Sequence, residues 1–205
     1  MSKRWYLVLS LVVVLACVAG LRMRTTVVFD GNSLVAGQGA PRWHGFADET
    51  MRSLGWAYRS DRFGVGAQTT AAMLADAESQ IDRCYSPGAV LVVWEVTNDL
   101  YFGATAEEAV DRLEVYCLAR KRAGFRVVVL NVLPRSDADD RFEARRISAN
   151  QLIASRWTNF ADACVDVAAI PELSRPNPEH FADGTHLNHR GAEIAGKAVA
   201  GAINR

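Results

Sequence analysis

Residues 89–94 have the sequence AVLVVW, a run that is apolar at every position. A second run of this kind, RVVVLNVL, covers residues 126–133. Strands buried on both faces have continuous apolar runs of this length, whereas half-exposed strands alternate apolar and polar residues. Both runs are therefore predicted to be central strands of a parallel sheet. Residues 27–29 (VVF) are a shorter candidate, and weaker ones lie at 58–63 and 164–167.

Helical patterns lie between these strands. Thr105 and Glu108 fit a capping box at the start of one helix, and Gly124 fits its end. Residues 137–157 are predicted to form a longer helix, and residues 191–203 an alanine-rich terminal helix. The buried side of the 137–157 helix is assigned to Phe142, Ile147, Leu152 and Ile153.

Strands that alternate with helices form parallel βαβ units. The predicted fold class is therefore α/β, a three-layer α/β/α sandwich with about five parallel strands. In such sheets ligands bind at the carboxyl ends of the strands. The residues that follow each strand are consequently the candidates for a functional site.

Composition excludes several classes of function. The chain has 205 residues, with 23 positive and 23 negative side chains. This balance argues against nucleic-acid binding, which usually needs a basic surface. The four cysteines, Cys17, Cys84, Cys117 and Cys164, have no C-x-x-C spacing, so neither a zinc cluster nor another metal site is predicted. A pairing of Cys84 with Cys164 or Cys117 stays open, and no oligomeric state is indicated.

The N-terminal residues differ from the rest of the chain. Lys3 and Arg4 precede residues 5–21, which are apolar apart from Ser10 and Gly20. A charged start before an apolar run is typical of a secretory signal, and the run also approaches the minimum length for spanning a bilayer. Residues 1–24 are therefore predicted to be a signal peptide or a retained membrane anchor. Residues 25–205 are then one domain, exported or anchored, that faces the cell envelope.

Three alternatives remain for this segment. Arg22 and Arg24 follow the apolar run and favour retention as an anchor. Cys17 offers a lipid-attachment site, although Leu15 and Val18 beside it fit such a site poorly. A buried core helix is disfavoured because the run has no polar face.

The first strand is followed by GNSL at residues 31–34. A serine in a tight glycine-containing turn between a strand and a helix can expose its hydroxyl, and nearby backbone N–H groups can point into the same space. On its own, Ser33 is more simply explained as a turn or N-cap serine.

Two further loops add polar groups. Residues 64–70 (GVGAQTT) lack the Lys-Ser/Thr ending of a Walker loop, so they suggest an oxyanion site at the N–H of Gly66 or Ala67, or else a phosphate site. Asn98 follows the 89–94 strand, and its amide either donates to a developing negative charge or bonds to its own turn. Glu95 either is partly buried and orients the serine loop, or meets solvent.

The last motif is DGTH at residues 183–186. A carboxylate three residues before a histidine can orient the imidazole and stabilise its charged form, which makes His186 a candidate general base for Ser33. His180 and His189 are rival bases without an acid at this spacing, and His44 is assigned to the surface or to packing. Each motif alone can arise by chance, but together, in chain order at predicted strand ends, they indicate one site.

These motifs resemble those of the SGNH (GDSL-type) hydrolase family over about residues 25–205. Residues 31–34 resemble its first block (GDSL in the family), residues 64–70 its second, residues 96–99 its third and residues 183–186 its last. The resemblance implies a flavodoxin-like fold and ester hydrolysis through an acyl-serine. It implies a catalytic triad of Ser33, Asp183 and His186. The implied oxyanion hole consists of the N–H groups of Ser33 and Ala67 (or Gly66) and the Asn98 amide.

Three residues depart from the family pattern. Asn32 replaces an aspartate that shapes the serine loop, and this is expected to have a modest effect. Ala67 stands at a glycine position, where an alanine is strained if φ must be positive; a shift of one residue would place Gly66 there instead. Val96 replaces the third-block glycine and adds bulk close to Asn98.

The sequence thus predicts a metal-independent serine esterase that uses no cofactor. Its predicted partner is a small-molecule or glycan ester, such as an O-acetylated glycan or a lipid ester, and it contacts a membrane only through an uncleaved N-terminal segment. An acyltransferase with the same triad and a non-catalytic envelope-binding domain remain alternatives. A flavin or nucleotide binder is a third, supported only by Gly64 and Gly66.

Overall fold

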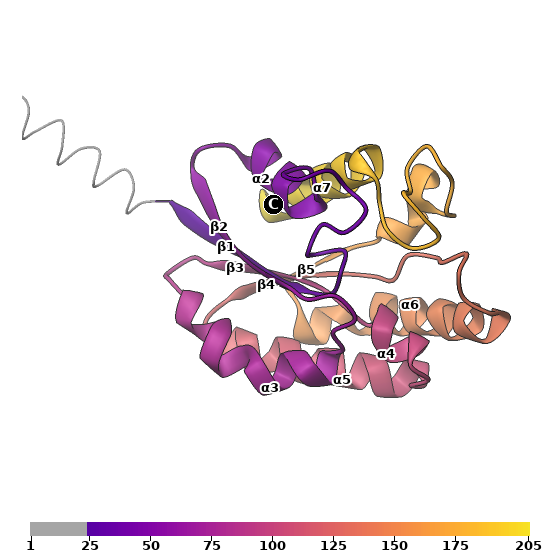
Figure 1. The fold of residues 1–205 in the computed structure, drawn as a ribbon. Helices are drawn as coiled ribbons and strands as arrows, with labels where there is room; N and C mark the ends of the chain where they lie inside the picture. The colour runs from indigo at the N-terminus through magenta and orange to yellow at the C-terminus, as the bar shows by residue number, and fades with distance from the viewer. Residues whose placement is uncertain (1–23) are drawn as a thin grey trace, which may run out of the picture.

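The computed structural model describes residues 24–205, which form a five-stranded parallel sheet between two layers of helices (Figure 1). The order across the sheet is β2-β1-β3-β4-β5, so the chain changes direction between β1 and β3. This order is the flavodoxin-like one, whose ligand site lies at that switch point. The predicted α/β fold with five parallel strands is confirmed. The strands are β1 (Thr25–Gly31), β2 (Tyr58–Gly64), β3 (Val90–Trp94), β4 (Arg126–Leu130) and β5 (Ala163–Val165).

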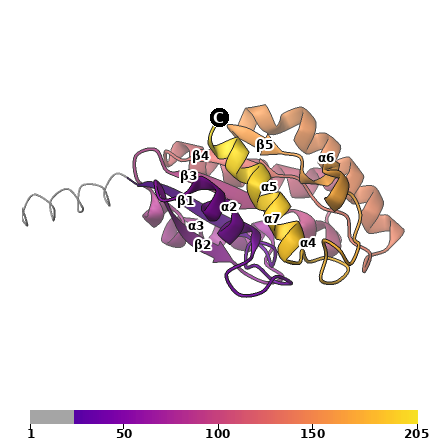
Figure 2. The same ribbon diagram turned by 90° about the horizontal axis from the view of Figure 1, so that it is seen from above.

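Helices cover both faces of the sheet. In Figures 1 and 2, α2 (Phe46–Leu54) and α7 (His189–Ile203) lie on one face. The opposite face is covered by α3 (Thr70–Gln80), α5 (Ala106–Arg122) and α6 (Asp140–Phe160), with the short α4 (Thr97–Tyr101) beside them. Residues 24–205 also contain three short 3₁₀ helices, η1 (Asp82–Cys84), η2 (Val167–Ala169) and η3 (Pro171–Leu173).

The central strands are buried on both faces, as their continuous apolar runs predict. In β3, Val90, Val92 and Trp94 pack in the core on the α2–α7 side. The alternate residues Leu91 and Val93 pack in the core on the α3–α5–α6 side. Successive side chains of a strand point to opposite faces, so a strand between two helical layers needs an apolar residue at every position.

The predicted start of α5 is confirmed in detail. Thr105 Oγ1 accepts the N–H of Glu108 at 3.1 Å, and Glu108 Oε2 accepts the N–H of Thr105 at 3.0 Å. This reciprocal capping box satisfies two N–H groups that the helix itself leaves without a partner. Gly124 follows directly after the end of the helix and its cap, at a positive φ of 106°.

Some predicted boundaries were wrong. The strand predicted to reach residue 133 ends at Leu130, because the side-chain amide of Asn150 bonds both the N–H and the C=O of Val132. The helix predicted from residue 137 begins at Asp140, because Asp139 caps it through the N–H of Phe142. Ile147 is exposed rather than buried, since it lies off the face of α6 that carries Phe142.

Smaller differences affect the other ends. The fifth strand covers Ala163–Val165 instead of residues 164–167, and the terminal helix begins at His189 instead of residue 191. The side chain of Asn188 caps that helix by accepting the N–H groups of Arg190 and Gly191. Helix α2 was not predicted from the sequence.

The predicted signal peptide or anchor, apart from Arg24, lies outside the described residues. Within residues 24–205, no helix combines the length and the apolar character that crossing a membrane requires. Over the same residues, Cys84, Cys117 and Cys164 are free thiols, so none of the pairings considered between them is formed.

Candidate active site

The candidate site lies where β1 and β3 end side by side. Gly31 ends β1 and pairs with Trp94 at the end of β3. A Cβ atom on Gly31 would stand 2.1 Å from the carbonyl oxygen of Trp94, so only glycine fits this close approach. The chain then turns away from the sheet and presents Ser33 beyond the strand ends.

Asn32 shapes the turn that carries Ser33. Its side chain is fully buried, and its Oδ1 accepts the N–H of Leu34 at 2.8 Å. An Asx turn of this kind holds the backbone two residues on. Asn32 can therefore fill the loop-shaping role expected of the aspartate it replaces, without carrying a charge.

The predicted triad residues meet in space. His186 Nε2 lies 2.9 Å from Ser33 Oγ, and His186 Nδ1 lies 2.8 Å from Asp183 Oδ2. The Ser33 and His186 side chains are largely buried, whereas Asp183 is half exposed. The hydroxyl, the imidazole and the carboxylate thus form one continuous hydrogen-bonded chain.

The Asp183 carboxylate is held by its own loop. Its Oδ1 accepts the backbone N–H groups of Thr185 and His186, both at 2.7 Å. Burial opposes ionisation of this carboxyl, but the hydrogen bonds from His186 and Thr185 outweigh it and lower the pKa of Asp183. Asp183 is therefore an anion at neutral pH, placed to fix the tautomer of His186 and to stabilise its charged form.

A second loop braces the turn at residues 183–186. Thr185 Oγ1 donates to Asp137 Oδ1 at 2.7 Å, and the N–H of Ser136 donates to the Gly184 carbonyl at 2.8 Å. Hydrogen bonds from Arg135, together with the one from Thr185, lower the pKa of Asp137 to about 2. The contacts between this loop and the 183–186 turn were not expected from the sequence, because they join residues far apart in the chain.

The rival histidines have other partners. His180 Nδ1 bonds the side chain of Asn177 at 3.1 Å. His44 and His189 both contact the carboxylate of Glu49, on the α2–α7 side of the sheet. His186 is therefore the histidine that the fold brings to Ser33.

The second predicted loop has the strained backbone expected of its alanine. Ala67 has a φ of 59°, whereas Gly66 does not adopt a positive φ. The left-handed position is thus Ala67 itself, and no shift to Gly66 is needed. The loop does not present a free phosphate cradle, because Asp99 accepts the N–H of Thr70 and Thr69 accepts the N–H of Ala72 at the start of α3.

Asn98 is held by this second loop. Its side-chain Nδ2 donates to the Gln68 carbonyl at 2.8 Å, and the residue is 7% exposed. A side-chain amide has two N–H groups, so one remains for a further acceptor. The preceding Val96 has a φ of 88°, and its side chain is fully buried in the core.

Two carboxylates support the Asn98 loop from below. Asp99 accepts the N–H and hydroxyl of Thr70 at 2.9 and 2.8 Å and pairs with Arg112 at 3.0 Å, which ties α4 to α3 and α5. Sequence reasoning did not single out this role of Asp99. Of the two alternatives for Glu95, exposure to solvent is excluded, because the residue is 1% exposed. Its Oε1 accepts the N–H of Asn98 at 3.1 Å.

Burial raises the pKa of Glu95 well above its usual range, although the hydrogen bond from the N–H of Asn98 opposes the rise. Its second oxygen, Oε2, has no hydrogen-bond partner within the described part of the chain. A buried charge without a partner is costly, so this environment favours the protonated form of Glu95 over the ionised form.

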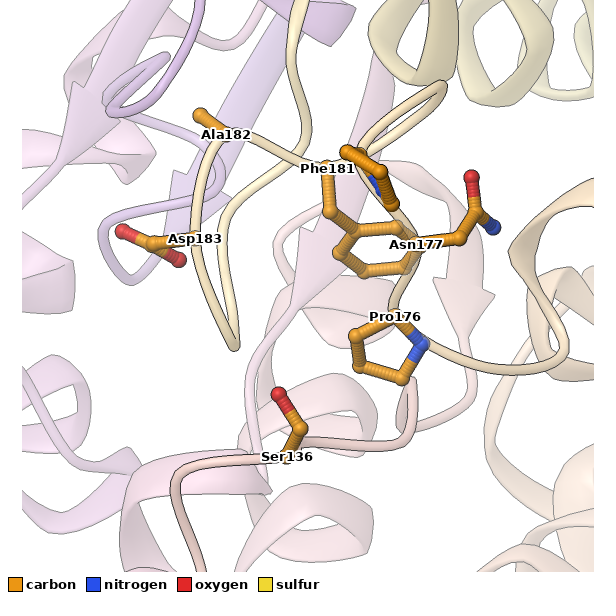
Figure 3. A pocket seen from close by; sticks show the side chains of 7 residues that line it. Ser136, Pro176, Asn177, Phe181, Ala182 and Asp183 are labelled. Atoms are coloured by element: carbon orange, nitrogen blue, oxygen red, sulfur yellow. The ribbon is translucent and has the colours of Figure 1, made fainter.

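A pocket of about 270 Å³ opens next to Asp183 (Figure 3). In Figure 3 the rings of Phe181 and Pro176 lie next to each other in this pocket, Ser136 lies at its edge, and the carboxylate of Asp183 points away from the rings. Ser33 and His186 are not among the residues that line it. The pocket therefore adjoins the hydrogen-bonded chain without containing the serine.

The site thus holds the hydroxyl of Ser33 beside the imidazole of His186, which the carboxylate of Asp183 orients. This is the arrangement of an activated nucleophile and its base. An amide N–H of Asn98 and the backbone N–H groups of Ser33 and Ala67 are the candidate donors to an oxyanion. Among the described residues, one group of three side chains, His44, Glu49 and His189, could hold a metal ion, and it lies outside this chain of hydrogen bonds.

Comparison with known folds gives the same architecture. The chain is similar to a member of the lipolytic G-D-S-L family from Veillonella parvula, with a TM-score of 0.74, 18% identity and coverage of 88% of this chain and 99% of that chain. A carbohydrate acetylesterase family member from Sinorhizobium meliloti has a TM-score of 0.71 and 17% identity, with coverage of 88% and 97%. A GDSL-like lipase from Bacteroides thetaiotaomicron has a TM-score of 0.69 and 19% identity, with coverage of 88% of both chains.

At the level of sequence, no curated protein matches the chain. The model of the GDSL-like Lipase/Acylhydrolase family, however, matches residues 29–194. The match begins before the turn that carries Ser33 and ends beyond His186, so it includes every motif of the candidate site. The chain therefore belongs to the GDSL-like lipase/acylhydrolase family of ester hydrolases.

Proposed function

We propose that the protein is a serine esterase that cleaves carboxylic esters through an acyl-serine intermediate. The observation that carries the proposal is the continuous chain from Ser33 Oγ through His186 to Asp183, with contacts of 2.9 and 2.8 Å at the switch point of the sheet. A serine hydroxyl becomes nucleophilic when an adjacent base accepts its proton, and this geometry provides that base.

The reaction proceeds in two steps. His186 takes the proton of Ser33 while Ser33 Oγ attacks the ester carbonyl, and the same proton then passes to the leaving alcohol as the acyl-serine forms. Water next attacks the acyl-serine with His186 again as base, which releases the acid. The N–H groups of Ser33 and Ala67 and the Asn98 amide hold the oxyanion in both steps, and none of these steps needs a metal or a cofactor.

For the substrate, we propose a short acyl ester, foremost an O-acetyl group on a glycan. One solved structure with this fold is a carbohydrate acetylesterase family member, which supports this substrate class. The pocket beside Asp183 has a mixed polar and apolar lining and can take the part of a substrate that lies away from the reacting ester. An exported or membrane-anchored location would bring the site to envelope glycans; this location is a proposal from residues 1–24 of the sequence.

The test is hydrolysis of p-nitrophenyl esters from acetyl to long acyl by the purified chain and by Ser33→Ala. We expect activity that falls with acyl length and disappears in the variant. A fluorophosphonate probe should label the wild-type chain on Ser33. A folded chain that neither hydrolyses any ester nor reacts with the probe would refute the proposal and favour a non-catalytic binding domain. Added acceptor alcohols would reveal acyl transfer.

A further inference from the structure

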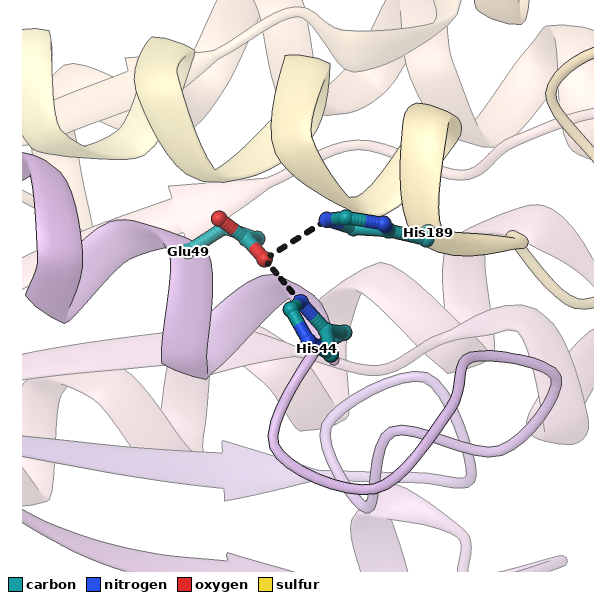
Figure 4. Close-up of side chains that lie close together, drawn as sticks. All are labelled: His44, Glu49 and His189. Atoms are coloured by element: carbon teal, nitrogen blue, oxygen red, sulfur yellow. Dashed lines mark hydrogen bonds and ion pairs between the residues drawn. The ribbon is translucent and has the colours of Figure 1, made fainter.

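His44, Glu49 and His189 form a compact cluster on the α2–α7 side of the molecule (Figure 4). His44 lies in the loop before α2, Glu49 lies in α2, and His189 is the first residue of α7. Glu49 Oε1 is 3.1 Å from His44 Nδ1 and 3.2 Å from His189 Nε2. The three donor atoms lie within 4.8 Å of one another.

We propose that this cluster is a binding site for one divalent transition-metal ion of the zinc type, separate from the serine site. Two imidazole nitrogens and one carboxylate oxygen are a donor set that suits Zn²⁺, whereas Ca²⁺ and Mg²⁺ prefer oxygen alone. In a tetrahedral site with bonds of about 2.0–2.1 Å, neighbouring donors stand about 3.3 Å apart. The two distances around Glu49 Oε1 already approach that separation.

The environment of Glu49 supports the proposal. Its side chain is 5% exposed, and its other oxygen, Oε2, pairs with Arg52. This pairing fixes the carboxylate and leaves Oε1 directed at the two histidines, as Figure 4 shows.

The two histidines face water on their outer side. Their side chains are 38% and 45% exposed for His44 and His189, and their ring centroids are 4.1 Å apart. Water can therefore supply the fourth ligand, which is the arrangement of an open zinc site. The rings of His44 and His189 each direct a nitrogen at Glu49 Oε1. A cation bound between the three donor atoms would replace these two contacts to the same oxygen.

The consequence of binding is a cross-link near the active site. His44 and His189 belong to segments far apart in the chain, and a shared ion would join the loop before α2 to the start of α7. His186 lies three residues before His189. In the same loop as His44, Gly39 packs so closely that a Cβ on it would stand 2.6 Å from His186 Cβ. The ion would thus stabilise the segment that carries His186 without touching Ser33.

The sequence predicted no metal site and placed His44 at the surface or in packing. The reason is that Glu49 gave no signal of its own in the sequence, and only packing of α2 against α7 brings it between the histidines. The inference does not depend on the proposed esterase activity.

The test is a calorimetric titration of the full chain with ZnCl₂. The protein is produced without a histidine tag, kept in mild detergent and stripped of metal with EDTA beforehand. We expect one Zn²⁺ per chain and a rise in Tm on binding. His44→Ala and His189→Ala should each weaken binding at least a hundredfold and abolish the rise in Tm. His180→Ala is the matched control, since His180 lies outside the cluster, and it should bind as the wild type does.

Two further results decide the location and the geometry. His186→Ala should keep full Zn²⁺ affinity, because the serine site is not the proposed binding site. Co²⁺ in place of Zn²⁺ should give the visible absorption of four-coordinate cobalt. The proposal is overturned if the stripped wild-type chain binds no Zn²⁺ stoichiometrically, whatever the variants do. It is equally overturned if His186→Ala loses the binding, or if His44→Ala and His189→Ala, shown by circular dichroism to be folded, keep it.

Discussion

The neighbouring strands β1 and β3 end differently, although both lead into the candidate active site. β1 ends at Gly31, where a side chain would collide with a backbone carbonyl. β3 is followed by Val96, which keeps a positive φ of 88° while its side chain is buried in the core. At Gly31, the neighbouring backbone leaves no room for any side chain. At Val96, by contrast, packing of the side chain in the core holds the residue in its strained backbone conformation.

The two strand ends also carry different parts of the proposed chemistry, and this gives the largest expected effect. Ser33 follows β1 and supplies the nucleophile, so Ser33→Ala should lower kcat about 10⁴-fold or more. Asn98 follows β3 and supplies one oxyanion donor, so Asn98→Ala should lower kcat about 10²–10³-fold. The measurement is p-nitrophenyl acetate hydrolysis at saturating substrate.

Ser148→Ala on the exposed surface of α6 is the control for these variants and should leave kcat unchanged. A folded Asn98→Ala variant with wild-type kcat would remove the amide from the oxyanion hole. The β3 end would then have only a structural part in the site.

A substitution at the end of β1 should have the largest effect on stability. The Cβ of Gly31→Ala would stand 2.1 Å from the Trp94 carbonyl oxygen, so the two strands must separate. We expect a loss of at least about 3 kcal/mol in the free energy of unfolding, measured by urea denaturation. In Gly201→Ala, by contrast, the new Cβ has nothing within 4 Å and lies in α7, so this control should be neutral or slightly stabilising. Equal effects of the two variants would contradict the close approach.

The buried carboxyls of Asp30, near the end of β1, and Glu95, directly after β3, should make the free energy of unfolding depend on pH. Burial raises the pKa of Asp30 from 3.8 to about 6, although the hydroxyl of Tyr116 donates to it. The folded state then holds a proton that the unfolded state has lost, so stability falls as the pH rises from about 4 through 6. At neutral pH this loss is about 3 kcal/mol, from about two pKa units.

Asp30→Asn should flatten this part of the stability curve, because an amide oxygen can still accept from Tyr116 without a charge. The measurement is urea denaturation at a series of pH values between 4 and 8. Burial shifts the pKa of Glu95 in the same direction, so Glu95→Gln should act with the same sign at the end of β3. Asp61→Asn on the exposed edge strand β2 is the control. A steep slope that survives in Asp30→Asn would assign the dependence to other groups.

The parts of the fold that the sequence predicts are those that depend on local pattern. Continuous apolar runs predicted β3 and β4, because a strand between two helical layers has no polar face. The hydrogen bond between His186 and Asp183 was also predictable from local pattern, because both residues lie in one short turn. Asn32 likewise bonds within its own turn.

Contacts between distant segments were predictable only in part. Ser33 and His186 are brought together by the order of the strands, which the motif blocks indicated through their places at strand ends. The sequence did not predict that Asp99 anchors α3 or that Glu49 lies between two histidines. Both are helix residues whose contacts arise only when other segments pack against them. The burial of Glu95 has the same origin: a strand-end residue meets solvent or core according to what covers it.

The smallest expected effects come from the two residues that replace family glycines. Ala67 is exposed and has a φ of 59°. Ala67→Gly relieves backbone strain of about 1 kcal/mol but also increases the conformational entropy of the unfolded chain. The net change in the free energy of unfolding should therefore stay within about 1 kcal/mol. Val96→Gly relieves similar strain but removes a fully buried side chain, so a loss of about 1–2 kcal/mol should remain. Urea denaturation of both variants, each with an unchanged slope against urea, measures the difference. If Val96→Gly proves the more stable of the two, then strain rather than packing dominates at the end of β3, and the contrast with Gly31 disappears.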